Sequence, residues 1–332
     1  MNNSTNFQAN LSLTSSAPSA TRVPRNLAIF IVTFVAICVS AGAFGNARVC
    51  VLLSKRQDLR KVPHYFLANL AMTGVLSSVI HAPLIIVMTV ANYFQIRGES
   101  VVEILCRATF PSGFAFIVLN APTLWLMALD RQDCVCRPFR RRLTTSNVKK
   151  IIPVMWMLSL LTYVFIVMAM RNESFACIQI YPYSNDPPKF SRPMVGLIAI
   201  VGQLDNVTVL IIIVTFFRVM KRMRSPTVNS SLNSTFQRQE KTLTMLTYKI
   251  CGVFLLCRVP NNAHFFLKKI GGFQSTPAAT LVTITLIHLM YVANPFIYHK
   301  MLKVRFTNRE RATVRQAVEP RELANSAKEK SG

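Results

Sequence analysis

The chain has 332 residues, 52% of them apolar, and its mean hydropathy is positive, which is the composition of a membrane protein. Its formal charge is +25, a value that also occurs in nucleic-acid-binding proteins. Here, however, the bases follow apolar stretches along the whole chain, so membrane topology and anionic lipid explain them and nucleic acid is excluded as a partner.

Seven apolar stretches are long enough to cross a bilayer core of ~30 Å, which takes about 20 helical residues. They predict an all-α bundle with spans at 27–54, 63–92, 108–134, 150–170, 193–218, 242–267 and 274–299. The first 25 residues are polar and contain no signal-peptide core, so the first span is expected to act as an uncleaved targeting signal. We therefore expect a tail over 1–25, a transmembrane domain over 26–300 and a second tail over 301–332.

The distribution of Lys and Arg predicts the orientation of this bundle. Bases collect in the first, third and fifth connections and after Lys300, and such segments are cytoplasmic. The N-terminus is then extracellular, as expected for a receptor of the plasma membrane. Sequons at Asn3, Asn10 and Asn172 fall in predicted outer segments, where we expect them to be glycosylated.

Cysteine positions predict one disulfide. Six of the eight cysteines fall inside spans or at their cytosolic edge, where thiols stay reduced. Cys106 and Cys177 alone lie on the outer side, at the start of the third span and in the loop between the fourth and fifth. They are the natural pair, and their bridge would hold this loop across the mouth of the bundle. Two unpaired outer thiols are the alternative.

The third span ends in an acid and a base, Asp130 and Arg131. From Cys106 to Arg131 the chain advances 25 residues, or ~37 Å of helix, about a bilayer core plus one interface. The pair therefore lies at the cytosolic mouth. A lone charged side chain at the end of a span usually extends its charged group into water and has no further role. That is the alternative to a functional role for Arg131.

Short motifs occur on successive spans in a fixed order. They are Gly45-Asn46 with Val49, Asn69-Leu70-Ala71, Cys106 with Asp130-Arg131, Trp156, Phe254 with Cys257 and Pro260, and Asn294-Pro295 with Tyr298. In this order and at these depths they resemble the motifs of the rhodopsin-like (class A) G-protein-coupled receptors, over nearly the whole helical length. The resemblance implies a seven-helix receptor that binds an extracellular ligand and activates a heterotrimeric G protein.

The resemblance also implies roles for residues at the cytosolic end. In the family, the Arg of the Asp-Arg pair is held by its neighbouring acid and by a Glu at the start of the sixth span, until activation frees it. The matching acid is Glu240, 20 residues before Pro260, so Arg131 is expected to pair with Asp130 and Glu240. Alternatively, Glu240 is only an acid at a helix start.

Two mid-span prolines, Pro260 and Pro295, are the expected hinges of the sixth and seventh spans, because each removes a backbone hydrogen bond. A membrane span tolerates them where neighbouring helices satisfy the freed groups. Tyr298 and Phe254 match family positions that repack when these helices swing, and Asn294 belongs to the same switch motif as Pro295 and Tyr298. Tyr298 and Phe254 could equally be plain core residues.

Several departures from the family pattern limit what the resemblance implies. Gly74 stands where the family usually has an Asp, and Asn120 and Met290 line the same region, so no carboxylate remains to hold sodium. Gly113 replaces the Asp that binds amine ligands, and His288 replaces the Lys that carries retinal in opsins. We therefore expect no metal or cofactor, and neither an amine nor retinal as ligand.

The largest departure is Arg258, which replaces the Trp at the floor of the family's ligand cavity, while Asp205 falls on a fifth-span position that is usually aromatic. A charge in mid-membrane needs a partner. Asp205 lies 17 residues before Arg222 and Arg258 lies 18 after Glu240, so their heights above the cytosol are similar. We expect a buried ion pair between them. The alternative is that one or both face a watery cavity and contact the ligand directly.

The segment after Tyr298 mixes apolar residues with bases, which predicts a short amphipathic eighth helix on the inner leaflet. No nucleophile motif, phosphate loop or metal signature occurs, so an enzyme is not expected. A coupling receptor is the favoured function, and a non-coupling seven-helix decoy or scaffold is the alternative. The second outer loop, with Tyr181 and Asp186 among its residues, favours a peptide or another polar ligand.

Overall fold

The computed structural model describes residues 24–55, 61–93, 99–137, 140–171, 192–224, 235–270 and 285–298, together with 279, 282 and 283. Over these residues every regular element is helical. The elements are α1 (Arg25–Lys55), α2 (Val62–Leu76), the π-helical turn η3 (Ser77–His81), α3 (Ala82–Tyr93), α4 (Glu99–Cys136), α5 (Thr145–Arg171), α6 (Arg192–Met223) and α8 (Thr235–Ile270), followed by helical residues 285–298.

Within the described chain, six helices are long and apolar enough to cross a membrane, and the second of them combines α2, η3 and the first residues of α3. Helical residues 285–298 fall in the predicted seventh span. Several helices run past the apolar stretches, since α4 begins at Glu99, α5 at Thr145 and α8 at Thr235. Hydropathy detects only the part of a helix that lies in lipid, so these polar turns were not predicted.

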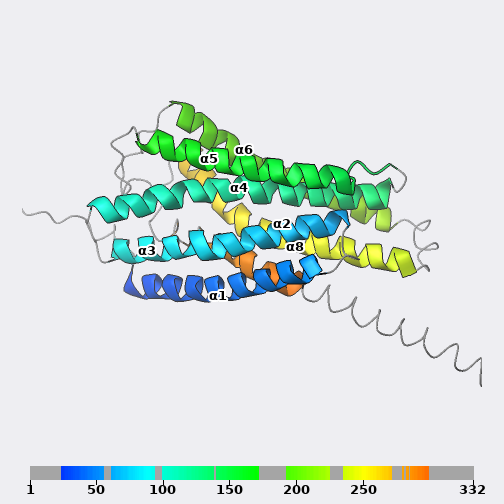
Figure 1. Cartoon of the computed structure of the whole chain (residues 1–332), viewed down its shortest axis with the longest axis horizontal. Coiled ribbons are helices and arrows are strands. Elements are labelled where there is room, and N and C mark those ends of the chain that lie inside the picture. The colour runs from blue at the N-terminus through cyan, green and yellow to red at the C-terminus, as the bar shows by residue number, and fades with distance from the viewer. Residues whose placement is uncertain are drawn as a thin grey trace, which may run out of the picture.

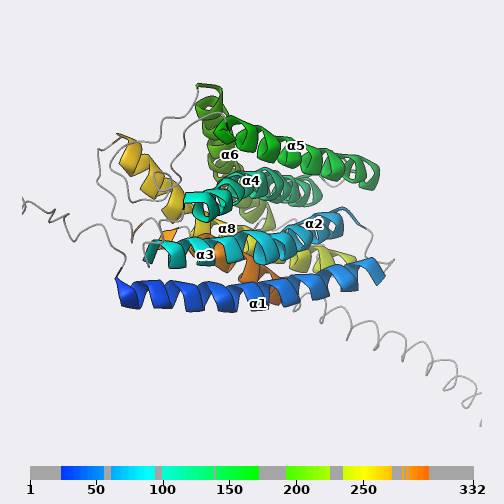
Figure 2. The ribbon, with the colours of Figure 1, turned by 60° about the vertical axis from the view of Figure 1, so that its left-hand side comes forward.

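The helices form a bundle in which α4 is central. It packs against α2, α3, α5, α6 and α8, and α1 lies at the opposite edge of the bundle from α5 (Figures 1 and 2). Large apolar side chains are exposed on the outside of the bundle, among them Phe44 on α1, Leu160 on α5 and Leu256 on α8. Such an apolar exterior is what a bilayer requires of the helices that face it.

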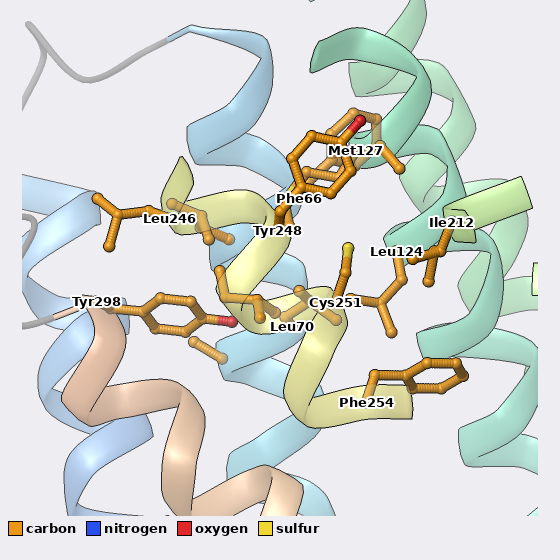
Figure 3. Close-up of a cluster of buried hydrophobic side chains, with 14 of the residues drawn as sticks. Phe66, Leu70, Leu124, Met127, Ile212, Leu246, Tyr248, Cys251, Phe254 and Tyr298 are labelled. Atoms are coloured by element: carbon orange, nitrogen blue, oxygen red, sulfur yellow. The ribbon is translucent and has the colours of Figure 1, made fainter. Parts of the chain in front are cut away.

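The largest apolar cluster is inside the bundle and joins α1, α2, α4, α6, α8 and the last described helix. Figure 3 shows Phe66 and Met127 near Tyr248, Phe254 farther along α8, and Tyr298 pointing from the last helix toward α8. This cluster fills the inside of the bundle and fixes how α4 and α8 face one another.

The motif residues Gly45 and Asn46 join α1 to its neighbours. A Cβ at Gly45 would lie 2.7 Å from Cβ of Pro295, so only glycine lets the two helices approach this closely. Asn46 Nδ2 donates to the carbonyl oxygens of Gly42 and Tyr291, both at 2.8 Å. A buried amide thus satisfies a carbonyl of the helix that Pro295 interrupts.

Candidate functional site

The first candidate site is an ionic cluster at the C-terminal end of α4, which we call the latch: Asp130, Arg131 and Glu240. Arg131 Nε donates to Asp130 Oδ2 at 3.0 Å, and Nη2 of the same guanidinium also contacts this carboxylate. Nη1 donates to Glu240 Oε2, on α8, at 2.8 Å. The structure therefore brings together the three residues that the motif spacing selected.

Burial divides the latch into a fixed half and a releasable half. Arg131 is 1% exposed and Asp130 is also buried, whereas Glu240 is 21% exposed. A partly wet ion pair is stabilised by only about 1 kcal/mol. The buried contact with Asp130, in which two N–H groups donate to one carboxylate oxygen, is charge-assisted and stronger. Separating α8 from α4 would therefore break the Glu240 contact first and leave Asp130 in place.

A third acid, Asp133, fixes the chain that follows α4. Its Oδ2 accepts the backbone N–H of Arg142 at 3.2 Å and lies 3.8 Å from Nε of the same residue. Asp133 is buried, so the contact anchors the return toward α5 beneath the latch. The sequence offered only a weak signal for this role, an acid three residues after Asp130 and shortly before a run of arginines.

The second candidate site is the ion pair in the middle of the bundle. Arg258 Nη2, on α8, lies 2.7 Å from Asp205 Oδ2, on α6, and the side chains are 7% and 2% exposed. Asp205 Oδ1 and Arg258 Nε are buried and have no hydrogen-bond partner in the described part of the chain. In this structure the two charges face each other, and neither is open to water.

Near this pair, polar side chains of three other spans lie in contact. His81 Nδ1 lies 2.8 Å from Ser112 Oγ, and the His81 and His288 rings stack with centroids 5.5 Å apart. Below them Asn120 Nδ2 donates to the Tyr291 hydroxyl at 2.8 Å. The stacking was not predicted, because spacing along the chain does not tell which side chains of distant spans meet.

Among the described residues, these histidines have no third metal-binding side chain beside them. Over the residues that the structure describes, no group of three His, Cys, Asp or Glu side chains could hold a metal ion. At the family's sodium position, a Cβ on Gly74 would lie 2.7 Å from the amide of Asn46. The space of the missing carboxylate is therefore occupied by the Asn46 side chain.

The remaining predicted switch residues lie around the apolar cluster. Asn294, Tyr298 and Phe254 are buried, and the last two belong to the cluster (Figure 3). Pro260 lies within α8, whose helix continues on both sides of it. Pro295 packs against α1 at Gly45. These positions connect the middle of the bundle with the latch.

Some predicted sites lie outside the described residues: the Cys106 side chain, Cys177, the sequons at Asn3, Asn10 and Asn172, and the tail from Met301. The disulfide, the sugars and the amphipathic helix therefore stay predictions. The six other cysteines are free thiols.

Comparison with known proteins agrees with this geometry. The profile of the family described as 7 transmembrane receptor (rhodopsin family) matches residues 45–298. The chain is 23% identical to neuropeptide Y receptor type 2 of Cavia porcellus over 288 residues, which cover 81% of this chain and 72% of that protein. It is 25% identical to somatostatin receptor type 4 of Rattus norvegicus over 273 residues, which cover 79% and 66% of the two chains.

The crystal structure of squid rhodopsin has a similar fold. It aligns with a TM-score of 0.63 at 20% identity and covers 83% of this chain and 78% of its own. The match confirms the predicted all-α bundle of seven helices.

Proposed function

Because the chain belongs to the rhodopsin family of seven-transmembrane receptors, we propose that it binds an extracellular ligand and activates heterotrimeric G proteins at the plasma membrane. The observation that carries this proposal is the latch. A guanidinium that is 1% exposed is held by one carboxylate of its own helix and one of α8. Separating α4 from α8 would expose Arg131 to a cytosolic partner.

The energetics of the latch suit a switch. Its α8 contact, between Arg131 and Glu240, is worth about 1 kcal/mol, which is small beside the binding energy of an extracellular ligand. A ligand that prefers the open bundle by a few kcal/mol is therefore enough to shift the population. We expect the N-terminus to be extracellular, so that ligand and G protein approach from opposite sides.

The mid-membrane pair would transmit the ligand signal. Arg258 and Glu240 lie on the same helix, 18 residues or ~27 Å apart, so a ligand that shifts Arg258 also moves the cytosolic end of α8. Pro260, two residues from Arg258, interrupts the helix hydrogen bonding and allows this end to swing. Asp205 would hold α8 in the resting position until the ligand competes for the guanidinium.

The ligand class is the least constrained part of this proposal. The two relatives are named as receptors for neuropeptide Y and somatostatin, which supports a peptide ligand for this chain. A peptide offers backbone amides and carbonyls that could reach the unsatisfied Asp205 Oδ1 and Arg258 Nε once the pair opens.

A non-coupling decoy or scaffold is the second candidate. It is favoured by Gln132, which replaces a Tyr next to Arg131, and by the ionic contact that replaces the aromatic floor of the cavity.

The test is G-protein dissociation in cells, without ligand, across a panel of Gα subunits. Arg131→Ala should abolish the basal signal and Glu240→Gln should raise it, because the second change opens the α8 contact and leaves the arginine intact. Lys241→Ala, a change at the exposed neighbour of Glu240, is the control and should leave the signal unchanged. Equal signals from all four forms at equal surface expression would contradict coupling through this latch.

A further inference from the structure

Five polar side chains lie close together in the middle of the bundle, and we call them the polar core: His81, Ser112, Asp205, Arg258 and His288. The His81 and His288 rings stack with centroids 5.5 Å apart and 10° between their planes. His81 is within electrostatic range of Arg258, which pairs with Asp205. Side chains of η3, α4, α6, α8 and the last described helix therefore form one polar region.

The hydrogen bonds around His81 fix its tautomer. The Ser112 hydroxyl donates to the Thr109 carbonyl oxygen at 2.8 Å, which uses the only hydrogen that it has. Ser112 Oγ can therefore only accept from His81 Nδ1, which lies 2.8 Å away, so the hydrogen of the neutral imidazole is on Nδ1. The other ring nitrogen, Nε2, then has a lone pair that can take up a proton.

Nε2 of His81 lies beside a gap at Gly113. A Cβ on Gly113 would lie 3.9 Å from this nitrogen and 3.5 Å from the adjacent Cε1, and no other atom outside this part of α4 would lie within 4 Å of it. His81 and Gly113 are both partly exposed, whereas Asp205 and Arg258 are buried. The gap therefore gives access to the polar edge of His81.

Arg258 has a further donor for a bound group. Its Nε is buried and has no hydrogen-bond partner in the described part of the chain. An anion that accepts from this N–H would compete with Asp205, whose charge now cancels that of Arg258. The anion alone would leave a net charge of −1 in the polar core, which is costly in mid-membrane. One proton on His81 Nε2 would restore a net charge of zero.

We propose that the polar core binds a carboxyl group of the extracellular ligand together with one proton. One carboxylate oxygen would accept from Arg258 Nε, and the other, in the gap at Gly113, would accept from the protonated Nε2 of His81. This inference rests on the proposed function, since it names the ligand group that competes with Asp205 for the guanidinium. The carboxyl group belongs to a peptide C-terminus or to a small organic acid.

The surroundings of His81 support binding of an acid there. The neighbouring helices bring these titratable or charged side chains toward it: Cys38 on α1, Arg107 on α4, Asp205 on α6, Arg258 on α8, and His288 and Tyr291 on the last described helix. The titratable residues of α2, at positions 64 and 65, lie at its other end, and the described part of α3 has no charged side chain. Arg107 lies six residues, or ~9 Å of helix, before Gly113. Asp205 is the only acid in this set, and it already has a partner.

The test is binding to purified receptor in lipid nanodiscs, measured without G protein as a rise in unfolding temperature. The probes are a hexapeptide library with free C-terminal carboxylates, the same library with C-terminal amides, and four small acids: acetate, butyrate, succinate and benzoate. Only probes with a carboxylate should stabilise the receptor, and the arm that does so identifies the source. Stabilisation by the amidated peptides equal to that by the free acids, or by no probe, would overturn the proposal.

The pH dependence of the strongest probe tests the proton. Its dissociation constant should rise roughly 10-fold for each pH unit between pH 6 and 8, because one proton is bound with it. In His81→Gln the constant should change by less than about 2-fold over the same range, since the proton acceptor is gone. A slope that persists in His81→Gln, or is absent from wild type, would overturn the proposal.

Variants of the ion pair test the position of the carboxylate. Asp205→Asn with Arg258→Gln, which keeps the core neutral, should weaken binding at pH 6 by roughly 10-fold to 100-fold, as expected for lost hydrogen bonds to a charged group. Asn206→Gln, next to Asp205 but on the outer face of α6, is the matched control and should bind like wild type. A double variant that also binds like wild type would overturn the proposal.

The same measurements separate this inference from the proposed function. Acid binding by a receptor that activates no G protein would support the carboxylate site and contradict only the coupling. Basal nucleotide exchange by Glu240→Gln receptor that binds none of the acids would support the coupling and overturn only the carboxylate site.

Discussion

Removing one charge of the mid-membrane pair should destabilise the protein, and removing both should cost less. Asp205→Asn leaves the Arg258 guanidinium 7% exposed and without a counter-ion, and Arg258→Gln leaves a carboxylate that is 2% exposed. Two unit charges 2.7 Å apart attract by about 6 kcal/mol at an effective dielectric constant of ~20, which is an upper bound because desolvation opposes it. Breaking a buried pair from one side typically costs about 3–5 kcal/mol.

The double variant Asp205→Asn with Arg258→Gln replaces the two ions by two neutral amides, although Gln is shorter than Arg. It carries no uncompensated charge, so its free energy of unfolding should lie within about 1–2 kcal/mol of wild type. The two substitutions should therefore be strongly non-additive.

Thermal unfolding of receptor in lipid nanodiscs, followed by thiol-reactive fluorescence, measures this difference. The single variants should unfold at least about 5 °C below wild type, and the double variant should recover most of this loss. Asn206→Gln on the outer face of α6 is a control for substitution in mid-span. The reasoning is refuted if either single variant is as stable as wild type, or if the losses of the two single variants add in the double variant.

Three further predictions concern the latch, the neighbouring Asp133 and the close helix contacts. Glu240→Gln removes about 1 kcal/mol from the resting state, so the basal rate of G-protein activation should rise by about 5-fold, measured as nucleotide exchange. Asp133→Asn should lower the free energy of unfolding by about 1–2 kcal/mol, because it weakens a charge-assisted bond to the segment after α4; an unchanged unfolding temperature would contradict this. Gly74→Ala should reduce surface expression, since its Cβ would lie 2.7 Å from Asn46, whereas Gly252→Ala has open space and should be neutral or stabilising.

Much of the fold could be predicted because the bilayer imposes a length on each span. The spans follow from hydropathy, and the depth of a residue follows from counting along a helix. Depth placed Asp205 at the height of Arg258, the family resemblance matched Glu240 to Arg131, and the structure brings each of these acids to its base. Contacts between charges are predictable in this way because so few partners exist in the membrane.

Contacts that depend on side-chain direction were not predictable. The π-helical turn at Ser77–His81 has no residue type that marks it, although it turns His81 toward Ser112. The exposure of Asn206 and the partial exposure of Asn262 could not be read from the sequence, which does not reveal which face of a nearly uniformly apolar helix is covered. Such features follow from the packing of the whole bundle and from no single motif.

Guanine-nucleotide exchange on purified G protein, with the receptor reconstituted in lipid nanodiscs, tests the central claim most directly. Receptor that carries Glu240→Gln should accelerate GTPγS uptake by at least one Gα subunit above the rate of empty nanodiscs, and adding Arg131→Ala to the same chain should return uptake to that rate. Uptake that stays at the rate of empty nanodiscs for every Gα subunit, with folded receptor present, would contradict a G-protein-coupling function held in check by the latch.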